Sequence, residues 1–144
     1  MQDMRGGVFS TYDWVANIIT DSLKQNLEME IEIVDRVKAN YLHANPKFKR
    51  GMYHTPHCDK HLEGGQDQPW ISAIYYVNES DGDTYFFNKF YGDYTGDMFN
   101  ISQVSPRRGR LVIFHSTRYH ASSCPLEYDK RMILNCVYKV KENS

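Results

Sequence analysis

The sequence has few cysteines, no excess of charge of one sign and no long hydrophobic run, and each shortage excludes a class of protein. Its three cysteines are an odd number without the short spacings of a zinc site, so we expect free thiols rather than a disulfide framework. The longest apolar runs, residues 71–77 and 111–114, are too short to cross a bilayer. The amino terminus also lacks the basic and apolar regions of a signal peptide. We therefore expect a cytoplasmic protein.

Acidic and basic residues are nearly balanced, with 17 Lys and Arg against 18 Asp and Glu and a net charge of −1. Without a long run of either sign, there is no electrostatic reason to expect binding to nucleic acid or to a membrane surface. A chain of 144 residues is long enough to bury a core of its own, and neither a linker nor an internal repeat divides it. We expect a single domain over residues 1–144 and leave the oligomeric state open.

Aromatic residues are in excess, at 14% of the chain, and they favour β-strands. One helix is nevertheless expected near the amino terminus, where Ser10 and Asp13 resemble a capping box. The apolar residues that follow at helical spacing are Trp14, Val15, Ile18, Ile19 and Leu23. They predict an amphipathic helix from about residue 11 to residue 24, with this stripe packed on a sheet.

The rest of the chain has the pattern of a β-protein. From Ile31 to Tyr41 apolar residues fall mostly on alternate positions, which favours a strand, although a helix is compatible with the same residues. Short β-like runs separated by turn signals then follow, at residues 50–59, 70–78, 83–88, 102–104, 110–115, 119–122 and 130–140, with a long loop over residues 89–101. Seven or eight strands without a βαβ rhythm predict a mainly β fold, a double-stranded β-helix (jelly roll or cupin-like) with a β-core over about residues 29–140.

Two metal-binding side chains, those of His57 and Asp59, lie two positions apart. In a strand such residues point to the same face, although a His-x-Asp pair by itself is common by chance. His120, on a distant predicted strand, would complete a set of two imidazoles and one carboxylate. That set is the facial triad typical of non-haem iron(II), which leaves coordination positions open for chemistry.

A basic residue, Arg131, opens the last apolar strand and shares one strand face with Ile133, Asn135 and Val137. If that face is buried, a guanidinium is costly there unless it pairs with an anion, and a carboxylate is its natural bidentate partner. Taken alone, Arg131 is more simply an exposed charge at a strand end. Together with the three metal-binding side chains, it favours a site for an acidic co-substrate.

The order of these motifs resembles that of the iron(II)- and 2-oxoglutarate-dependent dioxygenases, most closely their prolyl-hydroxylase-like branch. The resemblance covers roughly residues 52–138. The matching parts are residues 57–59, 74–78, 82–86 and 109–114, His120 and Arg131. The resemblance implies iron(II), 2-oxoglutarate and dioxygen as cofactor and co-substrates, with ascorbate as an additional reductant.

The resemblance also implies residue roles. His57, Asp59 and His120 would ligate the iron, whereas Arg131 and Tyr76 would bind the distal carboxylate of 2-oxoglutarate. Family members that halogenate replace the carboxylate ligand with a small residue. The presence of Asp59 therefore favours hydroxylation of an unactivated C–H bond, with release of succinate and CO2.

Asn135 and Tyr53 are further candidate contacts of the co-substrate or of the residues around it. The sequence has Ile133 where some other branches of the superfamily have Ser two positions after the Arg, so it departs from those branches and says little about the substrate. A peptide, an amino acid or another small molecule fits equally well. The loops at residues 60–69 and 89–101 are expected to frame its entrance.

Two other interpretations remain open from the sequence. In the first, zinc or another divalent ion is bound by His57, His61 and His120 in a cupin-like protein with a hydrolytic or structural role. That interpretation leaves Arg131 and Tyr76 unexplained. In the second, the chain is a non-catalytic jelly-roll module that binds a ligand or a partner protein through its aromatic loops.

Overall fold

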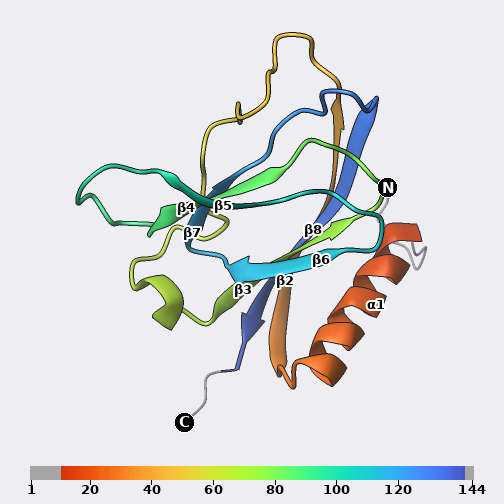
Figure 1. Ribbon diagram of the computed structural model, residues 1–144. Helices are drawn as coiled ribbons and strands as arrows, with labels where there is room; N and C mark the ends of the chain where they lie inside the picture. The colour runs from red at the N-terminus through yellow and green to blue at the C-terminus, as the bar shows by residue number, and fades with distance from the viewer. Residues whose placement is uncertain (1–10, 142–144) are drawn as a thin grey trace.

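The computed structural model describes residues 11–141, which form one α-helix, seven strands and one 3-10 turn (Figure 1). The elements are α1 (Thr11–Asn26), β2 (Ile31–His43), η1 (Gly65–Asp67), β3 (Trp70–Tyr76), β4 (Thr84–Phe90), β5 (Asn100–Val104), β6 (Leu111–His115), β7 (Arg118–Ala121) and β8 (Lys130–Val140). Antiparallel pairing gives a four-stranded sheet, β2-β8-β3-β6, and a three-stranded sheet, β5-β4-β7. The expected mainly β, jelly-roll-like fold with an amino-terminal helix is confirmed.

The expected strand over residues 50–59 was wrong, because this segment is irregular apart from one isolated bridge between His57 and His120 of β7. Two residues explain the difference. Pro56 has no N–H to donate to a ladder, and Gly51 has a φ of 89°, which lies outside the range of a strand. The jelly roll therefore has seven regular strands, and residues 50–59 run beside β7 with a single bridge in place of an eighth.

The strand interpretation of the segment after Ile31 was right, since β2 runs for 13 residues and pairs with β8 along its length. Two irregularities in register, one of them between Val34 and Arg36, shift the alternation of its side chains. Beyond this point Arg36, Lys38 and Asn40 stand opposite Val137, Asn135 and Ile133 of β8.

The four-stranded sheet has two different faces. On one face α1 packs over the main core, which contains Ile19, Leu23, Ile71, Ala73, Leu134, Cys136 and Tyr138. On the other face Ile74, Tyr76 and Ile133 form a second cluster, against which Val104 of the three-stranded sheet packs. This second face, between the two sheets, is the interior of the jelly roll. It carries every second residue of β3 and β8, including Ser72 and Arg131.

Helix α1 covers the sheet with a narrower stripe than expected. Ile19 and Leu23 are buried, whereas Trp14 and Ile18 are 64% and 49% exposed. Because each residue advances about 100° around the helix axis, a stripe centred on Ile19 and Leu23 carries Trp14 and Ile18 to its margin. The expected capping residue Ser10 lies outside the described residues. Within residues 11–141, no helix has the length and apolarity needed to span a membrane.

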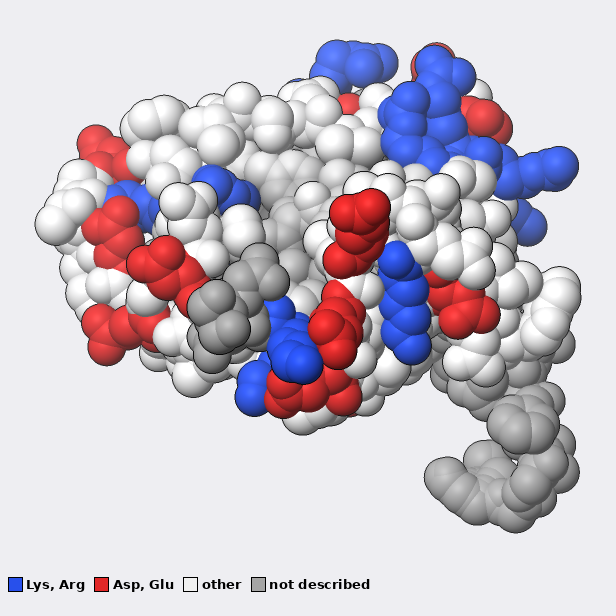
Figure 2. All heavy atoms as spheres, turned by 90° about the horizontal axis from the view of Figure 1, so that it is seen from below, with Lys and Arg blue, Asp and Glu red and all other residues white. Residues whose placement is uncertain are grey.

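Charged side chains of both signs are spread over the surface. Figure 2 shows one face, on which acidic and basic side chains are interspersed over much of the area and a group of basic side chains gathers at one edge. This mixture agrees with the nearly neutral net charge of the sequence.

Candidate metal centre

Three side chains with metal-binding atoms come together at one end of the jelly-roll interior. The ligand atoms of His57, Asp59 and His120 all lie within 4.8 Å of one another. Asp59 Oδ1 is 3.5 Å from His120 Nε2 and 3.9 Å from His57 Nε2. His61 does not belong to this cluster, because its exposed ring packs on Tyr91 with the centroids 5.1 Å apart. The described residues therefore do not assemble the three-histidine zinc site.

Backbone hydrogen bonds place the two imidazoles opposite each other. The His57 N–H donates to the His120 carbonyl, and the His120 N–H donates to the His57 carbonyl, both at 2.9 Å. Such a reciprocal pair brings the two side chains to the same side of the bridge, and their ring centroids are 4.4 Å apart. The Asp59 N–H donates to the Ser116 carbonyl at 2.9 Å, which ties the third residue to the turn before β7. The cluster thus forms although residues 57–59 are not a strand.

His120 has one ring nitrogen committed and the other free. Its Nδ1 lies 2.9 Å from the Arg118 carbonyl, which can only accept, so Nδ1 carries the proton. Its buried Nε2 has no hydrogen-bond partner among the described residues. An orphaned imidazole nitrogen beside a carboxylate and a second imidazole has the donor set of a transition-metal site. Burial and the neighbouring His120 also lower the pKa of His57, which favours the neutral, metal-binding imidazole.

Asp59 is held on both oxygens, and its side chain is fully inaccessible to solvent. The Ser72 hydroxyl donates to Oδ2 at 2.6 Å, and Arg36 Nη2 donates to Oδ1 at 3.2 Å. Burial acts to raise the pKa of Asp59, but the His120 imidazole, the Ser72 hydroxyl and the Arg36 guanidinium outweigh it and lower the pKa to about 2. The carboxylate is therefore ionised at neutral pH, as a metal ligand must be.

A second polar cluster surrounds Arg131, a side chain that is 1% exposed. Its guanidinium donates from Nε to the Gly82 carbonyl and from Nη2 to the Thr84 hydroxyl, both at 2.7 Å. The Tyr76 hydroxyl lies 2.7 Å from the same Thr84 oxygen. No carboxylate forms an ion pair with Arg131 within residues 11–141, and burial lowers its pKa. A buried cation without a counter-charge is costly, so this cluster suits an anionic ligand.

The two clusters are separated along the jelly-roll interior. Ser72, which contacts Asp59, pairs with Val137 of β8, and Arg131 lies six residues before Val137 on the same face. At about 3.3 Å per residue the two backbone positions are about 20 Å apart. The long Arg131 side chain bridges much of this distance, because its guanidinium reaches Thr84 of β4, two residues before Phe86, which pairs with His120. Asn135 stands between these positions, and its buried Oδ1 has no partner among the described residues.

An open cavity of about 310 Å³ lies between the two sheets. It is lined by Phe86, Ile101, Ser102, Val104, Val112, Ile113, Phe114 and Arg118. The Phe114 ring packs edge-on against the His120 ring at 4.6 Å between centroids, which connects this cavity to the metal-type cluster. Its volume and mostly apolar lining fall in the range of sites for small molecules.

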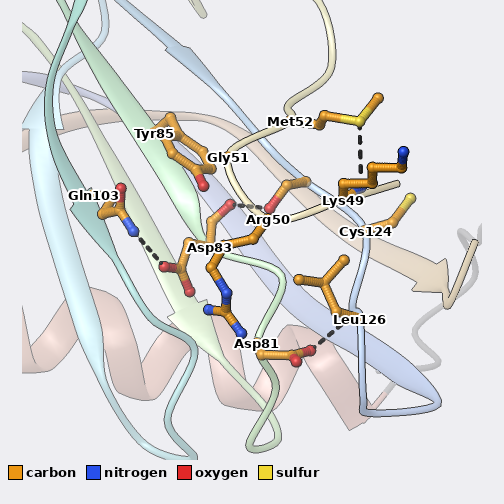
Figure 3. Close-up of a pocket in the computed structure, with 11 residues that line it drawn as sticks. Lys49, Arg50, Gly51, Met52, Asp81, Asp83, Tyr85, Gln103, Cys124 and Leu126 are labelled. Atoms are coloured by element: carbon orange, nitrogen blue, oxygen red, sulfur yellow. Dashed lines mark hydrogen bonds between the residues drawn. The ribbon is translucent and has the colours of Figure 1, made fainter. Parts of the chain in front are cut away.

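A smaller polar cavity flanks the Gly82 turn (Figure 3). Asp83 accepts a hydrogen bond from the Gln103 amide at 2.9 Å, and Asp81 accepts one from the Leu126 N–H at 2.8 Å. Figure 3 shows the Arg50 side chain reaching toward Asp81 and Asp83. With a volume of about 20 Å³, this cavity has room for one water molecule but not for a substrate.

Tyr53 is not brought to either cluster. Its ring packs on Tyr85 and Phe87, with centroids 5.2 and 5.0 Å away. Those two residues alternate with Thr84 and Phe86 along β4, so they lie on the face of the three-stranded sheet that points away from the interior.

The sequence interpretation missed Ser72, Thr84 and Arg36. Ser72 and Thr84 are hydroxyl residues within or beside apolar strands, where only their hydrogen bonds to Asp59 and Arg131 set them apart. Arg36 is one of the polar residues that alternate with the apolar ones along β2, and nothing in the sequence shows that β2 lies beside β8 and close to Asp59.

Comparisons with known proteins agree with this geometry. Residues 40–139 match the family model described as the 2OG-Fe(II) oxygenase superfamily. No curated protein sequence matches the chain.

Several solved structures have a similar fold. A Pseudomonas putida prolyl-4-hydroxylase is 18% identical, with 96% of this chain and 70% of that chain covered and a TM-score of 0.50. The nickel complex of the non-heme monooxygenase ThoJ is 15% identical, with 85% and 49% covered and a TM-score of 0.57, so this chain spans about half of that protein's length. An N-substituted L-amino acid dioxygenase from Burkholderia ambifaria, in complex with alpha-ketoglutarate, is 12% identical, with 91% and 68% covered and a TM-score of 0.52.

At these identities the structural likeness concerns the fold, whereas the family match covers well over half of the chain. The protein therefore belongs to the 2OG-Fe(II) oxygenase superfamily, whose members use iron(II), 2-oxoglutarate and dioxygen.

Proposed function

We propose that the protein is an iron(II)- and 2-oxoglutarate-dependent hydroxylase. The observation that carries the proposal is the pair of clusters in one interior: a His-Asp-His set at one end and a buried arginine without an acidic partner toward the other. A metal site alone suits many reactions. The unpaired buried guanidinium adds the requirement for an acidic co-substrate, which 2-oxoglutarate meets.

In this proposal His57, Asp59 and His120 hold the iron. Bound iron(II) supplies the activation of dioxygen that couples decarboxylation of 2-oxoglutarate to oxidation of a C–H bond. The protein's own contribution to this end of the interior is orientation. The Arg118 carbonyl fixes the tautomer of His120, and the Ser72 hydroxyl fixes the free oxygen of Asp59.

Arg131 and Tyr76 hold the distal carboxylate of 2-oxoglutarate in this proposal, and Thr84 aligns both of them. The Thr84 hydroxyl contacts the Arg131 guanidinium and the Tyr76 hydroxyl at the same distance, which fixes two hydrogen-bond donors toward the interior. Asn135, whose buried Oδ1 has no hydrogen-bond partner among the described residues, lies between this cluster and the metal ligands and is a further candidate contact. Tyr53 has no assigned role.

Hydroxylation is preferred because the third ligand is the carboxylate of Asp59, whereas family members that halogenate have a small residue in its place. Two proteins with a similar fold, a prolyl-4-hydroxylase and an N-substituted L-amino acid dioxygenase, support a peptide or an amino acid as the substrate. Other small molecules remain compatible with the cavity next to His120.

The test is succinate formation from labelled 2-oxoglutarate in the presence of iron(II) and ascorbate. Slow turnover without a substrate is expected from the wild-type protein and should fall to background in His57→Ala. His61→Ala is the matched control, because His61 is an exposed imidazole four residues away and outside the cluster. Equal loss of turnover in both variants, or no metal binding and no succinate from the wild type, would contradict the proposal.

A further inference from the structure

We propose that Arg36 binds a carboxylate group of the substrate at the mouth of the metal site. This inference rests on the proposed function, because it concerns the substrate of the same centre. It narrows the substrate class to molecules that carry a negative charge close to the C–H bond that is oxidised.

Arg36 is brought to the metal-type cluster by its place in the four-stranded sheet. It lies on the edge strand β2, opposite Val137 of β8, and Val137 pairs in turn with Ser72 of β3. These three paired residues form one row across the sheet, and from it the Arg36 guanidinium reaches Asp59 Oδ1 at 3.2 Å. The Asp59 side chain is fully inaccessible whereas that of Arg36 is 44% exposed, so the guanidinium lies between solvent and the carboxylate.

The oxygen that Arg36 contacts is also the one that faces the imidazoles. Asp59 Oδ1 is the oxygen close to His57 and His120, whereas Oδ2 is occupied by the Ser72 hydroxyl. A metal bound by this cluster therefore shares Oδ1 with Arg36. Because a carboxylate that coordinates a dication has less negative charge to offer a guanidinium, metal binding leaves Arg36 in need of another anion.

Two other basic side chains near this row already have acidic partners. Lys60 forms an ion pair with Asp35 at 2.8 Å, and Lys139 forms one with Glu32 at 3.2 Å. Within residues 11–141, Asp59 is the only acidic partner of Arg36. Arg36 is thus the cation that would have to share its one acidic partner, Asp59, with the metal.

The charges of the complete site lead to the same result. Asp59 and the keto-acid carboxylate of 2-oxoglutarate balance a dication, while the distal carboxylate balances Arg131. The positive charge of Arg36 is then left over at the half-exposed mouth, whereas Arg118, which lines the neighbouring cavity, is held by the Phe87 carbonyl and the Phe90 ring. A single residual charge matches a carboxylate better than a phosphate dianion, and the planar guanidinium can bind a carboxylate through two hydrogen bonds.

The experiment measures binding of a small probe rather than turnover. Protein loaded with zinc(II) in place of iron and with saturating 2-oxoglutarate is titrated with N-acetylglycine or with its neutral analogue N-acetylglycinamide, and dissociation constants are obtained from NMR spectra. The wild type is expected to bind the acid about tenfold more tightly than the amide, which corresponds to one charge-assisted contact. Arg36→Gln should abolish this difference, and Arg36→Lys should keep part of it.

Lys38→Gln is the matched control, since Lys38 is an exposed cation on the same face of β2, two residues further along. It should keep the wild-type preference for the acid. Equal binding of acid and amide by the wild type, or no binding of the acid, would overturn the inference. So would an Arg36→Gln variant that loses affinity for 2-oxoglutarate instead of the probe, because Arg36 would then serve the co-substrate. Failure of the proposed function has a different signature, namely no binding of 2-oxoglutarate to the metal-loaded wild type.

Discussion

Replacing Arg131, the buried cation between the two sheets, tests the co-substrate site directly. In Arg131→Met the guanidinium and its hydrogen bonds to Gly82 and Thr84 are lost, at about 1.5–3 kcal/mol each, but the cost of burying an unpaired charge, several kcal/mol, is also removed. These effects nearly cancel, so the folded state is expected to persist. The Thr84 hydroxyl keeps its contact with Tyr76.

Affinity for 2-oxoglutarate should respond much more strongly than stability. Loss of one partner of a buried, hydrogen-bonded charge pair costs about 2 kcal/mol or more, which is about 30-fold in the dissociation constant. At a concentration a hundred times the wild-type dissociation constant, 2-oxoglutarate stabilises the wild type by about 2.7 kcal/mol, or about 8 °C in melting temperature. The same concentration should stabilise Arg131→Met by less than about 1 kcal/mol, or about 2–3 °C.

The assay is thermal unfolding of zinc(II)-loaded protein with and without 2-oxoglutarate. Arg108→Met is the control, because Arg108 is an exposed arginine in the turn between β5 and β6, and it should keep the full shift. The shift caused by zinc(II) alone should be about the same in all three proteins, since Arg131 forms no hydrogen bond with His57, Asp59 or His120. A full 2-oxoglutarate shift in Arg131→Met would refute the assignment of the co-substrate site.

Three further predictions concern the residues around the two clusters. Ser72→Ala removes the donor to Asp59 Oδ2 and should weaken zinc(II) binding, measured by calorimetry, about tenfold or more; unchanged affinity would show that Ser72 does not position the ligand. Gly82→Ala would place a Cβ 2.5 Å from the Ser123 carbonyl oxygen and should destabilise the protein by about 1–3 kcal/mol in denaturant unfolding; unchanged stability would contradict this. Because the pKa of Asp59 is lowered to about 2, ionised Asp59 should add about 2 kcal/mol to the free energy of unfolding of the metal-free protein above pH 4, and this stabilisation should be lost as the pH falls toward 2. Between pH 4 and pH 2 the stability of Asp59→Asn should therefore fall less steeply than that of the wild type in acid unfolding; equal slopes would contradict this.

Much of the fold could be predicted because strand signals are local. Alternating apolar residues and Gly- or Asp-containing turns located β3, β4, β6 and β8 within a few residues of their bounds. The prediction failed at residues 50–59, where apolar and aromatic residues suggest a strand but Pro56 and the left-handed Gly51 prevent a continuous ladder. It also overestimated the buried stripe of α1, whose register depends on how the helix rests on the sheet.

The candidate ligands could be found from the sequence because His57 and Asp59 are close in the chain and His120 follows in the order of a known motif. Their neighbours could not be found in the same way. Arg36 meets Asp59 only because β8 inserts between β2 and β3, two strands that follow each other in sequence. Thr84 is important because it lies between Arg131 and Tyr76, which are far apart in the chain. Such contacts depend on tertiary register, which one sequence does not contain.

The reciprocal backbone pair between His57 and His120 has a consequence for how a metal would leave the protein. The segment that carries His57 is held to β7 by this isolated bridge and a few single hydrogen bonds, so it can separate from β7 without disrupting either sheet. Because His57 belongs to one of the two bridged segments and His120 to the other, separating the segments also pulls the coordination set apart. The rate of metal release should then follow local opening of residues 50–59, and amide hydrogen exchange there should slow when metal is bound, while exchange in β8 changes little.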